Sequence, residues 1–135
     1  MTDNAAARYQ QVQLRTSNPG EILIALFDGL FKFLLLAKHH MVAGRRGPSG
    51  EAISRAFAIV SELYCSLDHS KAPELCANLS SLYDFAMDRL TQANLKRDPL
   101  LIDEVIRVLT PVREAFSTVV KQQNVSVQAA SNAGR

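Results

Sequence analysis

The stretch RYQQVQLRTSNPGEILIALFDGLFKFLLLAKHH, from Arg8 to His40, decides the fold of this 135-residue chain. It contains a polar leader and then a block in which 13 of the 16 residues from Ile22 to Ala37 are apolar. The block falls short of the roughly 20 residues that span a bilayer, and Asp28 and Lys32 interrupt it. We therefore expect no membrane insertion. A soluble protein rarely carries a helix that is apolar on nearly every side, so another surface must cover this one.

The spacing of apolar residues predicts four helices, with no strand pattern, internal repeat or long linker between them. Their predicted ranges are about 19–43, 50–67, 73–96 and 99–121. The turns between them are short, so the fold class is all-α, an antiparallel four-helix bundle in one domain of residues 19–121. A short, movable N-terminal segment of residues 1–18 precedes the bundle. Residues 122–135 are small and polar without periodicity, which predicts a disordered tail.

The fourth predicted helix is unusual because its apolar stripe is about 160° wide, against roughly 100–120° for the second and third. Asp98 is its expected N-cap, with Pro99 in the first turn, just as Ser17 or Asn18 is the expected N-cap of the first helix before Pro19. Pro111 lies inside the stripe and removes the hydrogen bond to the carbonyl of Arg107, which predicts a kink or a break. A stripe this wide exceeds what one seam of a bundle hides.

Three surfaces are candidates for covering the surplus apolar area. In the first alternative, the helix after Pro19 lies at the centre of the bundle and is covered by its neighbours on every side. In the second, the leader, in which Tyr9, Val12 and Leu14 alternate with polar residues, lies across a groove. In the third alternative a partner docks an amphipathic helix into a groove. The central helix accounts for most of the block, but it does not explain the width of the last stripe.

Charge and cysteine content exclude several classes of protein. The net charge of +2 gives no support to nucleic-acid binding, and we interpret the pairs Arg45-Arg46 and Lys96-Arg97 as solvated loop charges. The two cysteines, Cys65 and Cys76, do not form a disulfide framework in a chain of this size. No secretory signal is visible at the N-terminus. These features predict a reduced, cytoplasmic protein.

Motifs for catalysis, cofactors and metals are absent from the sequence, which predicts a binding protein rather than an enzyme. The adjacent His39 and His40 point about 100° apart on a helix and cannot share a metal. The alternative function is a histidine phosphotransfer bundle of a phosphorelay. Such bundles carry a phospho-accepting histidine with a lysine three residues later. Lys71 follows His69 one place too early, and no lysine follows His40 at this spacing, so both matches are poor.

Particular strings resemble the flagellar secretion chaperone family. They are the leader with the start of the first helix (RYQQVQLRTSNPGEILIALFDG), SLD at residues 66–68, NLSSLYDFAMDRLTQANLKRD at residues 78–98, and LTPVREAF near the end. The resemblance covers residues 7 to about 120. It implies a bundle without cofactor or enzymatic activity that holds the C-terminal segment of flagellin, prevents premature polymerisation and assists delivery to the flagellar export gate. A homodimer of the free protein through the same apolar surface stays an open alternative.

The resemblance also assigns candidate residues by position. The movable leader, which can lie over part of the client site, has the candidates Tyr9, Gln10, Val12 and Leu14. The client groove has the candidates Ile102, Val105, Ile106, Leu109 and Val112. On this hypothesis, Val105→Asp or Ile106→Asp abolishes flagellin binding while helix content is kept. The family's usual Lys-Gly-Gly turn is here Lys71-Ala72-Pro73, a stiffer link.

Three further residues have predicted structural roles. Tyr83 is expected to be half-buried with its hydroxyl paired, and Asn94 is expected to hold the end of the third helix. Asp28 sits in the apolar block and should face solvent or a partner, because a buried unpaired carboxylate is costly. It can also pair with Lys32, four residues on.

Overall fold

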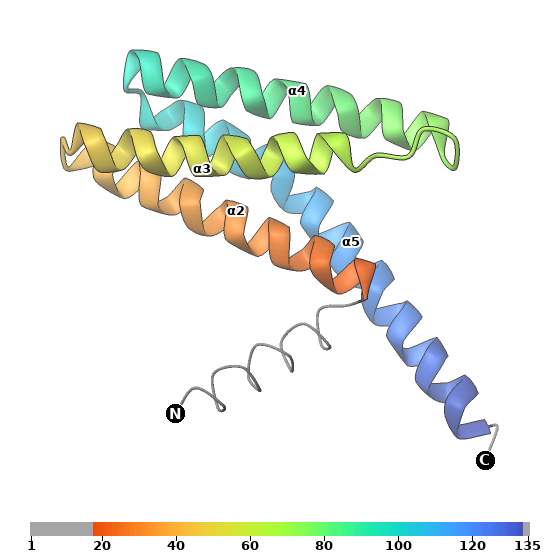
Figure 1. The fold of residues 1–135 in the computed structure, drawn as a ribbon. Helices are drawn as coiled ribbons and strands as arrows, with labels where there is room; N and C mark the ends of the chain where they lie inside the picture. The colour runs from red at the N-terminus through yellow and green to blue at the C-terminus, as the bar shows by residue number, and fades with distance from the viewer. Residues whose placement is uncertain (1–17, 134–135) are drawn as a thin grey trace, which may run out of the picture.

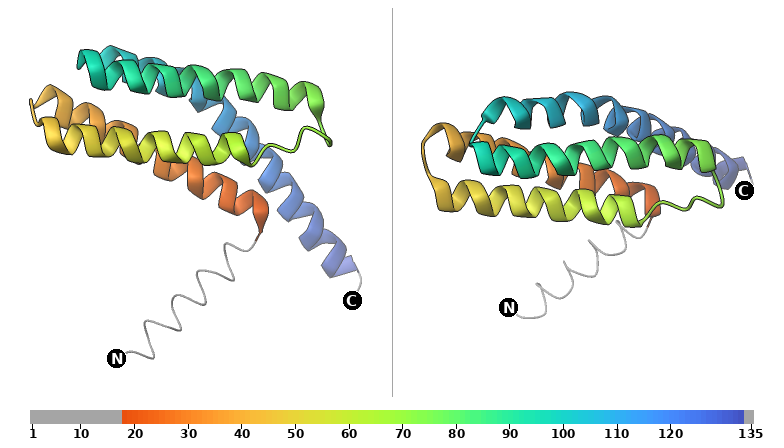
Figure 2. Two further views of the ribbon diagram at one scale, coloured as in Figure 1. Left: turned by 45° about the horizontal axis from the view of Figure 1, so that its top comes forward. Right: turned by 90° about the horizontal axis from the view of Figure 1, so that it is seen from above.

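The computed structural model describes residues 18–133, and this part of the chain is an all-α bundle of four helices (Figure 1). The helices are α2 (Pro19–Val42), α3 (Arg46–Cys65), α4 (Pro73–Lys96) and α5 (Pro99–Ala133). Each helix packs on the next in sequence, and α5 returns to pack on α2, which closes a ring. The predicted fold class is thereby confirmed. The views in Figure 2 show the turns α2–α3 and α4–α5 at one end, and the turn α3–α4 at the other.

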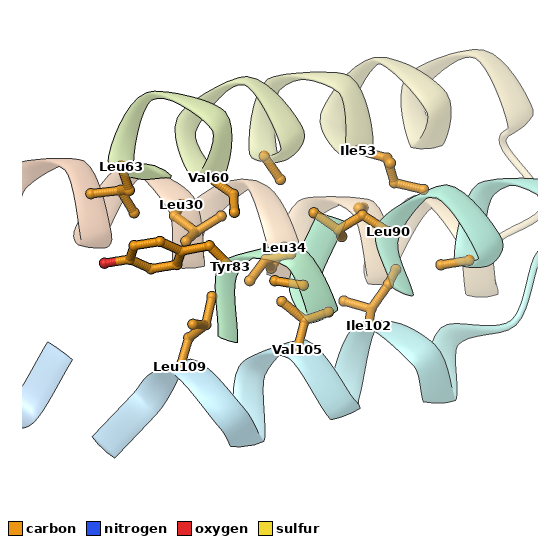
Figure 3. Packing of buried hydrophobic residues seen from close by; sticks show 14 of the residues in the cluster. Leu30, Leu34, Ile53, Val60, Leu63, Tyr83, Leu90, Ile102, Val105 and Leu109 are labelled. Carbon is orange, nitrogen blue, oxygen red and sulfur yellow. The ribbon is translucent and has the colours of Figure 1, made fainter. Parts of the chain in front are cut away.

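The core follows the predicted three-and-four spacing, and α2 contributes Phe27, Leu30, Leu34 and Ala37 to it, each with no exposed area. Figure 3 shows side chains of all four helices meeting in this cluster. The hypothesis that α2 is central is wrong, because among the described helices its backbone approaches only α3 and α5, and its side chains meet those of α4 only within the core. Its flanking side chains are half-buried against the core cluster, while Leu35 is 59% exposed. The apolar block is therefore not covered on every side.

The N-terminal caps of α2 and α5 agree with the prediction. The backbone N–H of Gly20 donates to Asn18 Oδ1 over 2.9 Å, and that of Leu100 donates to Asp98 Oδ1 over 3.0 Å. Side-chain acceptors at these positions satisfy N–H groups that have no partner within the helix.

The predicted start of α3 at residue 50 was too late, because the helix begins at Arg46. Gly44 has φ of +75°, so the chain reverses there within a few residues. Pro48 then falls in the first turn of α3, where its missing N–H would have had no helical partner. A glycine- and proline-rich composition indicated a loop, but the tight turn leaves most of these residues helical.

The predicted end of α5 at residue 121 is also corrected, since the helix continues to Ala133. Val120 is buried, and Asn18 Nδ2 donates to Asn124 Oδ1 over 3.2 Å, so α5 still contacts the start of α2 beyond residue 121. No break occurs at Pro111. Instead α5 bends along its length, and its last part extends past the other helices (Figures 1 and 2).

Candidate functional site

An open apolar groove lies between the first half of α4 and residues 108–119 of α5. Most of the α5 residues that line it belong to what we call the second half of this helix, the residues from Pro111 onward. The volume of the groove is about 480 Å³, and all nine lining residues are apolar: Leu75, Leu79, Leu82, Val108, Pro111, Val112, Ala115, Phe116 and Val119. Leu75 is 53% exposed and Val119 is 48% exposed, whereas Leu79 is buried at the floor. A surface of exposed large aliphatic side chains on two helices is typical of a site that receives another apolar surface.

The groove opens because the second half of α5 packs on α2 rather than on α4. Arg113 Nε donates to Asp28 Oδ1 over 2.7 Å, which links α5 to α2. The rings of Phe27 and Phe116 have their centroids 6.0 Å apart, so aromatic packing joins the same two helices. Asp28 thus pairs with Arg113 of the adjacent helix α5 and not, as its spacing suggested, with Lys32.

A close approach of α2 and α5 extends this contact. A Cβ added at Gly20 would lie 2.7 Å from Cγ2 of Val120, closer than van der Waals contact allows. Only glycine therefore permits α5 to come this near to the first turn of α2. The second half of α5 is held on α2 at several points from residue 113 to residue 124, and its side toward α4 is left uncovered.

In contrast, polar contacts join the first half of α5 to both neighbours. Lys38 Nζ of α2 lies 2.8 Å from Asp103 Oδ1, and Arg89 Nε of α4 lies 2.9 Å from Glu104 Oε2. The guanidinium of Arg89 also stacks on the ring of Phe85, 4.7 Å from its centroid. These contacts on both sides keep the α4–α5 interface closed near residues 99–109.

The five predicted groove residues separate into two groups in the structure. Ile102, Val105 and Leu109 are fully buried and point into the core, as Figure 3 shows, so they do not line the groove. Ile106 is half-buried beside the core, and only Val112 lines the groove. The reason is geometric: stripe width indicates that α5 has two apolar edges, but not which edge faces the interior.

This placement also changes the meaning of the predicted Val105→Asp substitution. A carboxylate at a fully buried position without a cationic partner would destabilise the fold itself, so loss of binding would say nothing about the groove. The sequence analysis did not predict that residues of α4 line the groove. Leu75, Leu79 and Leu82 read as part of one buried stripe, although Leu82 sits at its edge, directly before the buried Tyr83.

Several other predicted residues have a definite place. Tyr83 is buried, not half-buried, and no partner for its hydroxyl lies within residues 18–133; burial raises its pKa to about 12. Asn94 is exposed at the end of α4 and faces α3 near Gly50. The leader candidates Tyr9, Gln10, Val12 and Leu14 lie outside the described residues.

The surroundings of His69 and His40 do not resemble a catalytic or metal-binding site. His69 is exposed in the α3–α4 turn, and His40 lies in the last turn of α2, where Arg45 Nε donates to its Nδ1 over 3.0 Å. No three His, Cys, Asp or Glu side chains between residues 18 and 133 are grouped so that they could hold a metal ion. Among the helices described, none combines the length and apolar character needed to cross a membrane.

Comparison with known proteins gives one consistent family. A family model described as flagellar protein FliS matches residues 1–123. The flagellar secretion chaperone FliS of Salmonella typhimurium is 34% identical over 123 residues, which cover 87% of this chain and 91% of that protein. The protein of the same name from Bacillus subtilis is 31% identical over 120 residues, 89% of each chain. That from Vibrio cholerae is 31% identical over 107 residues, 79% of each.

Proposed function

The chain belongs to the flagellar protein FliS family of flagellar secretion chaperones, and from this premise we propose that it binds the C-terminal segment of flagellin in the α4–α5 groove. Binding covers apolar surface that flagellin would otherwise use to polymerise, and it keeps the subunit ready for delivery to the flagellar export gate. The proposed place of action is the cytoplasm, and no catalytic step is required.

The observation that carries the proposal is the open groove with nine apolar lining residues and no charged one. A client segment that becomes helical on assembly has an apolar face, and such a face fits a groove of leucine, valine and phenylalanine. Each large aliphatic side chain that the client buries contributes roughly 1.5–3 kcal/mol. Ordering a flexible segment costs several kcal/mol, so the contact must be long. The groove extends over about two turns of α4 and about three turns of α5.

Two further parts of the proposal concern the free protein. The leader, with Tyr9, Val12 and Leu14, covers part of the groove until flagellin displaces it. A homodimer through the same apolar surface is the other state in which the free protein hides it. Both states compete with flagellin for one surface. Each therefore lowers the apparent affinity for flagellin in proportion to the fraction of chains whose groove is already covered.

The test is a calorimetric titration of the full chain with a C-terminal fragment of flagellin. Val112→Asp places a charge in the groove on a half-buried position, and we expect its affinity to fall at least tenfold, about 1.4 kcal/mol. The matched control is Val125→Asp on the same helix, because Val125 is 66% exposed and lies outside the groove.

Circular dichroism of both variants verifies that the helices persist. We expect the affinity of Val125→Asp to equal that of the parent chain. Equal affinities for the parent and Val112→Asp, with both folded, would show that flagellin binds elsewhere.

A further inference from the structure

A second cavity lies at the opposite end of α4 and α5 from the groove, where the turns α2–α3 and α4–α5 come together (Figure 1). Its volume is about 250 Å³, and it is lined by Met41, Gly44, Arg45, Arg46, Ser49, Asn94 and Arg97. Three of the seven lining residues are arginines, and none is acidic. The fold therefore brings Arg45 and Arg46 to the same cavity as Arg97, about fifty positions later in the sequence, and the interpretation of these three as solvated loop charges is incomplete.

The cations of this cavity are weakly compensated. Arg45 donates from Nε to His40, a neutral acceptor in this contact, and Arg46 and Arg97 form no ion pair within residues 18–133. Arg97 caps α4 in the left-handed conformation, with φ of 54°, which fixes its backbone beside the cavity. The planar guanidinium group binds two oxygens of a carboxylate or phosphate at once through parallel N–H donors.

The N-terminus of α3 adds positive potential at the same place. Its cap residue, Arg45, forms no side-chain capping bond, and the first turn of α3 contains no acidic residue. The partial positive charge of a helix N-terminus is normally offset by a carboxylate, a capping oxygen or a bound anion. Here the first two are missing.

Ser49 adds a polar group to the cavity wall. Its side chain lines the cavity, and the residue as a whole is only 5% exposed. A hydroxyl group both donates and accepts hydrogen bonds. It can therefore donate to a ligand oxygen while the arginines neutralise the charge of the ligand.

We propose that this cavity binds a phosphate-type oxyanion, either inorganic phosphate or the phosphate group of a small phosphomonoester. The assigned contacts are the guanidinium groups of Arg46 and Arg97, the hydroxyl of Ser49 and the N-terminus of α3. The site is separate from the flagellin groove, shares no lining residue with it, and does not depend on the function proposed above.

The experiment is a calorimetric titration of the full chain with inorganic phosphate, and in a second arm with phosphoserine, at constant ionic strength set by sodium chloride. We expect one saturable site, and at least a tenfold weaker affinity for Arg46→Gln and for Arg97→Asn. Asparagine is chosen at residue 97 because it tolerates a positive φ. Ser49→Ala should weaken binding severalfold without loss of charge.

The control is Lys71→Gln, which removes the same charge at the other end of the bundle, where Lys71 is highly exposed. Its affinity for phosphate should equal that of the parent. Tighter binding of phosphoserine than of phosphate would identify a phosphomonoester as the ligand, and equal binding would identify the free anion. Unsaturable heats, or equal losses in Lys71→Gln and the arginine variants, would overturn the proposal.

Discussion

The two halves of α5 continue one apolar pattern but lie in different surroundings. In the first half, Ile102, Val105 and Leu109 have no exposed area and contribute to the core. In the second half, Val112 and Phe116 are half-buried, and Val119 is 48% exposed along the groove. The first half is linked by ion pairs to both α2 and α4, whereas the contacts found for the second half lead to α2.

This difference shows how one helix can serve both stability and binding. An apolar stripe wider than a single seam gives α5 two edges, and each edge can face the core or remain open. The choice depends on which neighbour holds the helix, and Pro111 stands near the point where the surroundings change. Exposed apolar area at the groove is a standing cost of about 25 cal/mol per Å², which a bound partner would remove.

The largest expected effect comes from truncating equivalent leucines in the two regions. Leu109→Ala removes a fully buried side chain and should lower the free energy of unfolding by about 2–5 kcal/mol. Leu75→Ala makes the same chemical change in the groove, at a residue 53% exposed, and should cost less than about 1 kcal/mol. Urea titration followed by circular dichroism measures both. Equal losses would erase the distinction between the closed and open regions.

A smaller effect is expected at high pH from Tyr83, which packs near Leu109 in the closed region (Figure 3). Burial raises the pKa of Tyr83 from 10.0 to about 12, so the unfolded chain loses this proton before the folded chain does. The stabilisation is complete below pH 10 and is lost as the pH rises to about 12, by about 2 kcal/mol.

Tyr83→Phe has no phenol and should lack this part of the pH dependence. Thermal unfolding of both proteins between pH 8 and pH 12 makes the comparison, because all other titrating groups are shared. Parallel curves for the two proteins would mean that the ring is solvated in the folded state and that the closed region is looser than described.

The smallest effect tests what holds the second half of α5. Gly20→Ala places a methyl group 2.7 Å from Val120 and should cost about 1 kcal/mol by forcing the helices apart. Gly47→Ala is the matched control, since a Cβ there meets nothing within 4 Å and should stabilise α3 by roughly 0.5–1 kcal/mol. Hydrogen exchange should become faster in residues 112–124 of Gly20→Ala but not in residues 99–109. Uniform acceleration along α5 would contradict the separate attachment of its halves.

Local signals predicted much of the fold. The caps at Asn18 and Asp98, the helix periods and the short turns gave the all-α bundle, because each depends on a few neighbouring residues. The helical start at Arg46 was missed since composition alone cannot show how tightly Gly44 turns the chain. The helical residues after 121 were missed because their attachment to α2 involves residues more than one hundred positions away.

The candidate site was predicted only in outline, for the same reason. The width of the α5 stripe indicated that an apolar surface would stay open, but the open edge depends on long-range contacts such as Arg113 with Asp28 and Val120 with Gly20. Val112 alone among the five predicted residues lines the groove. The leucines of α4 contribute one wall, and their spacing resembles that of an ordinary buried stripe.

The most direct test of the proposed site is a methyl NMR titration of the full chain with the flagellin fragment. If flagellin occupies the groove, the largest shifts should occur at the exposed or half-buried methyl groups of Leu75, Leu82 and Val112. The methyls of Leu35 and Leu95, which are exposed elsewhere on the bundle, should stay nearly unchanged. Large shifts at Leu35 or Leu95 with an unperturbed groove would contradict the assignment of the α4–α5 groove as the flagellin site.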